Sequence, residues 1–92
     1  MSPEQQLLEL QQLADGVDLR VREIRGTARS DFEPQAASGV CVIRGETWVV
    51  LSGADPLAER IRCLARALRE LRGAALEERF LSPALRELLN SA

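Results

Sequence analysis

The fold is decided by the stretch Val40-Cys41-Val42-Ile43-Arg44-Gly45-Glu46-Thr47-Trp48-Val49-Val50-Leu51. Two runs rich in β-branched residues flank a glycine, a pattern typical of a β-hairpin. Gly45-Glu46 predicts a two-residue turn with glycine at the first central position, as type II′ requires. In that register Ile43 pairs with Trp48, and Val42 pairs with Val49.

Both faces of this hairpin are apolar. One face carries Cys41, Ile43, Trp48 and Val50, and the other carries Val40, Val42, Val49 and Leu51. Because antiparallel sheets usually keep one face in water, we expect either helices on both faces or burial against another chain. The candidate interface residues are Val40, Val42, Trp48, Val49 and Leu51. Trp48 itself is open to two interpretations, as a core residue or as a binding hot spot.

Upstream of the hairpin, the sequence predicts a helix followed by a strand. Ser2 can cap the helix and Pro3 suits its first position, while leucines at spacings of three form its apolar face. Gly16 is expected to end the helix in the left-handed conformation. Residues 17–22 alternate apolar and polar, so they predict a strand with one buried face, at or towards the edge of the sheet.

Between strand and hairpin, residues 26–39 show no periodicity and predict a long surface loop, ordered or partly disordered. Downstream, Asp55 as cap and Pro56 at the first position predict the longest helix, ended by Gly73. Its apolar stripe is Leu57, Ile61, Leu64, Leu68 and Leu71. Residues 74–81 fit either a helical continuation or an extended segment, and Ser82-Pro83 starts a short final helix.

This order of elements predicts one α+β domain over residues 1–92. We expect a two-layer sandwich in the order helix, strand, long loop, β-hairpin, helix and short helix, with a three-stranded, mostly antiparallel sheet. A chain of 92 residues is long enough for a single core.

Composition argues against several kinds of activity. The chain has no His, so the commonest general base and metal ligand are missing, and only two Cys are present. We find no catalytic set, no cofactor motif and no metal-ligating cluster in the sequence. The chain is therefore expected not to be an enzyme.

All twelve basic residues are Arg, and three of them, Arg62, Arg66 and Arg69, form a stripe on the long helix. This stripe is a candidate site for anions or an acidic partner; the alternative is a solvated face paired locally, for instance through Glu59 and Arg62. A net charge of −2 and the lack of interleaved aromatic residues argue against nucleic acid as the favoured partner.

The N-terminal residues show no secretory signal, and no apolar run in the sequence approaches the length of a membrane span. Cys41 and Cys63 are expected to be free thiols. These features predict a cytoplasmic location.

The segments 7–21, 39–51 and 56–65 together resemble the core of the ImmA/IrrE type of zinc-peptidase-like domain. Where that family continues into its HExxH helix, this chain has Arg66-Ala67-Leu68-Arg69-Glu70. Both ligand histidines and the catalytic glutamate are missing. The resemblance therefore implies the fold without the metal site, in a pseudoenzyme or a scaffold.

The leading hypothesis is a non-catalytic protein-interaction or scaffold module that associates with itself or serves as a small subunit of a larger assembly. We expect a homo-oligomer, with no cofactor. The alternatives are a nucleic-acid-binding regulator that uses the Arg stripe, and a degenerate metallopeptidase-like domain.

Overall fold

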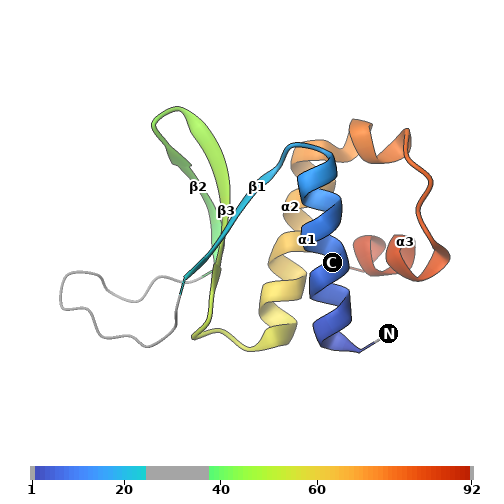
Figure 1. Ribbon diagram of the computed structural model, residues 1–92, viewed down its shortest axis with the longest axis horizontal. Coiled ribbons are helices and arrows are strands. Elements are labelled where there is room, and N and C mark those ends of the chain that lie inside the picture. Colours follow the sequence, from blue (N-terminus) through green and yellow to red (C-terminus); the bar gives the residue numbers. More distant parts are fainter. Residues whose placement is uncertain (1, 25–37, 92) are drawn as a thin grey trace.

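The computed structural model describes residues 2–24 and 38–91, and it has three helices on one side of a three-stranded sheet (Figure 1). Helix α1 spans Pro3–Gly16, and strand β1 spans Arg20–Ile24. Strands β2 (Gly39–Ile43) and β3 (Glu46–Ser52) form the hairpin. Helix α2 spans Leu57–Glu77, and α3 spans Pro83–Asn90. The predicted α+β class and the order of elements are confirmed. The predicted 26–39 loop falls outside the described residues, apart from Ser38 and Gly39.

The sheet is mixed, with strand order β1-β3-β2. Strand β3 pairs antiparallel with β2 and parallel with β1, so the prediction of a mostly antiparallel sheet holds for the hairpin alone. Strand β1 lies at an edge, as its single apolar face predicts. The strand in the middle is β3, where Val49 and Leu51 face the helices and are fully buried.

The hairpin turn differs from the predicted one by a residue. Its central residues are Arg44 (φ 52°) and Gly45 (φ 82°), and two positive φ values are those of a type I′ turn. Ile43 therefore pairs with Glu46, and Cys41 pairs with Trp48. Because the turn moves by one residue, each residue's partner on the other strand changes by two positions, for Ile43 from Trp48 to Glu46. Side chains alternate with a period of two, so the predicted membership of each face is unchanged.

Helix α1 ends in a Schellman motif whose left-handed residue is Asp18 (φ 60°), not the predicted Gly16. The Leu19 amide donates to the Ala14 carbonyl at 2.8 Å, and the Asp18 amide donates to the Asp15 carbonyl at 3.3 Å. Helix α1 therefore continues through Gly16, and β1 begins only at Arg20.

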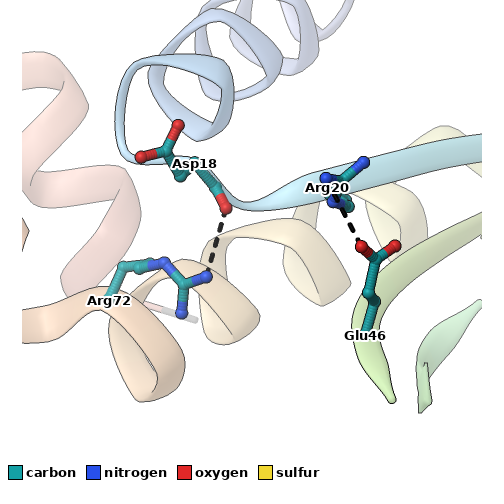
Figure 2. A network of polar contacts seen from close by, with 4 residues as sticks. All are labelled: Asp18, Arg20, Glu46 and Arg72. Atoms are coloured by element: carbon teal, nitrogen blue, oxygen red, sulfur yellow. Dashed lines mark hydrogen bonds and ion pairs between the residues drawn. The ribbon is translucent and has the colours of Figure 1, made fainter. Parts of the chain in front are cut away.

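Two arginines donate hydrogen bonds to the C-terminal end of α1. Arg72 lies within α2, and Arg79 follows two residues after its end. Arg72 donates to the carbonyl oxygen of Asp18 at 3.1 Å (Figure 2) and to that of Val17 at 2.9 Å. Arg79 donates to the carbonyl oxygen of Gly16 at 3.4 Å. These carbonyls lack partners within α1, so the guanidinium groups satisfy them. Arg72 itself is non-helical (φ −133°, ψ 27°), and α2 continues past it to Glu77. Gly73 therefore does not end the helix, and the ambiguous segment is helical only as far as Glu77.

The turn between β3 and α2 is held by hydrogen bonds to Ser38. The Ser38 amide donates to Asp55 Oδ2 at 2.8 Å, and the Ser52 amide donates to Ser38 Oγ at 2.9 Å. Asp55 was predicted to cap α2, but the helix has Pro56 at its N-cap position and no side-chain cap. The carboxylate instead joins the start of β2 to the start of α2. The pKa of Asp55 is lowered, mainly by the hydrogen bond from the Ser38 amide and to a smaller extent by that from the Ser38 side chain.

Helices α1 and α2 run side by side against the sheet, and α3 packs on them on the side away from the strands (Figure 1). Leu10, Leu64 and Leu68 are fully buried between these layers. Burying a leucine side chain contributes roughly 1.5–3 kcal/mol, so this apolar interface holds the two layers together. Ser82 caps α3 by accepting from the Leu85 amide at 3.2 Å, as predicted.

Candidate protein-interaction surface

The face of the sheet turned away from the helices, here called the outer face, carries a mixed apolar and basic surface. The register aligns Trp48 with Arg20 of β1 and Cys41 of β2 on this face. The Arg20 guanidinium lies 3.5 Å from the Glu46 carboxylate (Figure 2). It also lies 5.5 Å from the centroid of the Trp48 ring. Both partners of this ion pair are about half exposed, so it contributes at most about 1 kcal/mol. None of the three helices lies on the outer face (Figure 1).

On the opposite, inner face, the helices cover β3 but leave β2 open. Val49 and Leu51 of β3 have no exposed surface, whereas Val40 and Val42 of β2 are 50% and 68% exposed. All four residues belong to the same face of the hairpin. The difference arises because α2 packs on the central strand, and β2 projects beyond it as an edge.

The five candidate interface residues therefore divide into three groups. Val49 and Leu51 are core residues, so their assignment to an interface is wrong, because the helices already occupy that side of β3. Val40 and Val42 lie on the exposed edge strand. Trp48 lies on the outer face, half-buried beside Arg20. The exposed candidates thus lie on both faces of the sheet, Val40 and Val42 on the inner face and Trp48 on the outer face.

A groove of about 300 Å³ separates β2 from α2. Val40 lies on the strand side, while Cys63 and Ala67, one helical turn apart, provide small side chains on the helix side. The rim of the groove carries two residues of each charge, Glu59, Arg62, Arg66 and Glu70. Sequence reasoning missed this groove, although the small residues at 63 and 67 were its signal.

Burial raises the pKa of the Cys63 thiol, and the negative charges of Asp55 and Glu59 act in the same direction. The thiol is therefore favoured over the thiolate, which is the nucleophilic form. Cys63 opens into the groove, while Cys41 belongs to the outer face, and both are free thiols.

The residues of the Arg stripe are exposed on α2, but two of the three have partners. Arg62 pairs with the Glu59 carboxylate, and Arg69 donates to the Leu89 carbonyl of α3 at 3.0 Å. Arg69 therefore ties α3 to α2. Arg66 lies at the rim of the groove, between Arg62 and Glu70. The pairing of Arg62 with Glu59 agrees with the alternative given for the stripe, a solvated face with local ion pairs instead of a site for anions.

A second, wider hollow of about 740 Å³ lies along β1 and the end of α1. Carboxylates of Asp15, Asp18 and Glu23 line it together with Arg20 and Trp48. Glu23 accepts a hydrogen bond from the Gln11 amide group of α1. Across residues 2–24 and 38–91, no three His, Cys, Asp or Glu side chains gather in a way that could hold a metal ion.

Comparisons with family models, curated proteins and solved structures give no match for this chain. The resemblance to the ImmA/IrrE type of domain accordingly stays a prediction. Within the described residues, no helix is both long enough and apolar enough to span a membrane.

Proposed function

We propose that this chain is a non-catalytic protein-interaction module whose sheet is completed by another polypeptide. The observation that carries this proposal is the state of β2, an edge strand without a charged residue or a proline. Its side chains Val40, Val42 and Ile43 are all exposed.

Edge strands present a row of unpaired N–H and C=O groups and attract other chains. Monomeric proteins usually protect such strands with lysines, prolines or bulges. Strand β2 has none of these protections, and its side chains are apolar on both faces. These features support association at β2 as part of what the protein does, and an added strand would gain backbone hydrogen bonds and apolar contacts together.

The proposal is tested by the size of the complex in an extract of cells that produce the protein. We expect the wild-type chain to migrate well above its 10.2 kDa monomer mass, and Val42→Glu to migrate as a monomer. A charge at position 42 cannot be buried against a partner without a large desolvation cost.

Leu8→Glu is the matched control, because Leu8 is also an exposed apolar residue, 52% accessible, but lies on α1. It should leave the size of the complex unchanged. A wild-type chain that migrates as a monomer in the extract would contradict the proposed function.

A further inference from the structure

The strand that completes the sheet can be identified further, if the proposed function holds. We infer that it is β2 of a second copy, paired antiparallel across a two-fold axis that passes beside Cys41. The result is a six-stranded sheet in the order β1-β3-β2-β2-β3-β1, with the helices of both copies on the same side.

The backbone of β2 sets the hydrogen-bonding pattern for this pairing. Only two residues separate Ile43 from Glu46, so this pair exchanges both of its N–H···O bonds within the hairpin. The alternation of an antiparallel ladder then directs the N–H and C=O groups of Gly39 and Cys41 towards β3 as well. Those of Val40 and Val42 point away from the sheet, where no strand of the described residues pairs with them.

An antiparallel copy of β2 fits these outward groups in one register that uses the whole strand. Val40 exchanges two hydrogen bonds with Val42 of the partner subunit, and the symmetry repeats this pair, which gives four bonds. Gly39 lies opposite Ile43 of the partner subunit, so all five residues of the strand overlap. Cys41 then faces its own copy in a non-hydrogen-bonded pair, in which the Cα atoms are about 4.5 Å apart.

The side chains and charges favour a second copy as the occupant. On the inner face, Val40 and Val42 of both copies form a cluster of four valines. The groove between β2 and α2 of each copy lies beside this cluster. Because each rim carries two Glu and two Arg, the facing rims do not repel each other as rims of a single sign would. The low net charge of −2 likewise opposes self-association only weakly.

The size of this contact sets the expected affinity. A stable interface buries roughly 800 Å² on each partner, more than the pairing of a five-residue strand supplies. The valine cluster and the groove must provide the remainder. We therefore expect a dimer with a dissociation constant in the micromolar range.

The register is tested by oxidative crosslinking of the Cys63→Ser variant, in which Cys41 is the remaining thiol. The separation at the axis falls within the range for a disulfide, so treatment with the thiol oxidant diamide should give a covalent dimer of twice the monomer mass. Cys41→Ser, which retains Cys63, should give none. A variant with both cysteines replaced by Ser and Leu8 by Cys controls for random collisions, and it should also stay monomeric.

The hydrogen bonds are tested at Val42 by light scattering of the purified protein. Val42→Pro removes an N–H group that points away from β3, so the hairpin should persist while the dimer dissociates at least tenfold more readily. Val42→Thr keeps this N–H and should dimerise nearly as the wild type does. Circular dichroism of both variants reports whether the fold is retained.

Three outcomes separate this inference from the proposed function. A covalent Cys41 dimer that is lost in Val42→Pro supports the inference. A purified chain that stays monomeric at all concentrations overturns it, whereas the proposed function stands if the chain migrates in a larger complex in the extract. A dimer without crosslinking at Cys41 overturns the strand pairing but leaves self-association in place.

Discussion

The side chain of Arg72 donates a hydrogen bond to the main-chain carbonyl of Asp18 across 54 positions of sequence, at 3.1 Å. Helix α2 thereby closes the end of α1 at the only non-helical residue within its own length. The side chain of Arg72 thus joins the kink in α2, at Arg72 itself, to the left-handed residue Asp18 at the end of α1 (Figure 2).

Replacing Arg72 should therefore destabilise the junction between the two helices. Arg72→Met keeps an apolar stem but leaves the carbonyls of Val17 and Asp18 without this donor. We expect the free energy of unfolding to fall by about 1–3 kcal/mol in urea denaturation. Arg86→Met, at an exposed arginine on α3, is the control and should change it by less than about 0.5 kcal/mol. Equal losses in the two variants would argue against a role for the Arg72 hydrogen bonds.

The two strands of the hairpin should respond very differently to truncation of an apolar side chain. Leu51 of β3 is fully buried, so Leu51→Ala should cost about 2–5 kcal/mol through lost burial and a cavity. Val42 of β2 is 68% exposed, and Val42→Ala should change the stability of the monomer by less than about 0.5 kcal/mol. Thermal or urea unfolding at low protein concentration measures both. A large loss for Val42→Ala under those conditions would mean that β2 is covered within the monomer.

The hairpin turn places an arginine where asparagine is favoured. Arg44 adopts φ 52° ahead of Gly45, and Asn-Gly is the preferred pair for a type I′ turn. Arg44→Asn should therefore stabilise the protein by about 0.5–1 kcal/mol, seen as a higher midpoint of thermal unfolding. Arg44→Val, a β-branched residue in the same left-handed conformation, should do the opposite. No difference between the two variants would exclude a type I′ turn.

The contact between Asp55 and Ser38 should make stability depend on acid pH. The pKa of Asp55 is lowered in the folded protein from its ordinary value of 3.8, so the unfolded chain takes up the proton more readily. The stabilisation is fully present above 3.8 and is lost as the pH falls through the lower, folded value. In Asp55→Asn this part of the pH dependence should vanish. Urea denaturation of both proteins over a series of acid pH values provides the test, and parallel curves would contradict the prediction.

The Arg stripe is expected to stabilise the fold at one position. Arg69→Ala removes the hydrogen bond to Leu89 and should lower stability by about 1 kcal/mol through loosening of α3. A double Arg62→Ala, Arg66→Ala variant should change stability little, and wild type and variant alike should fail to retard duplex DNA at low ionic strength. Binding that weakens steeply with salt and is lost in the double variant would instead favour the nucleic-acid hypothesis.

The sequence predicts the elements of this fold well, because local signals determine them. The cap at Ser2, the proline at Pro3 and the leucine periodicity set α1, and Ser82 sets α3 in the same way. The division of hairpin residues into two faces also follows from the alternation alone. Moving the turn by one residue left that division intact, since each partner changed by two positions, one full period of the side-chain alternation.

Apart from the position of the hairpin turn, the errors occurred where a distant contact determined the outcome. Asp55 has the chemistry of a helix cap, but Ser38, 17 positions away, provides its hydrogen bonds. Gly16 has the conformational freedom for the helix end, yet Arg72 and Arg79 fix the terminus two residues later, at Asp18. Likewise, the burial of Val49 and exposure of Val42 depend on which strand α2 covers, and no local pattern contains that information.

The hydrogen bonds around the β3–α2 turn also define a natural site for engineering. The Gly53 amide donates to the carbonyl of Ile24, at the end of β1, at 2.9 Å, while Asp55 and Ser52 hold Ser38, at the start of β2. Both ends of the chain segment that joins these strands are thus fastened to the same turn, independently of what lies between them. Because both anchors lie at this turn, any length added between Ile24 and Ser38 costs a loop-closure entropy that grows only with the logarithm of that length.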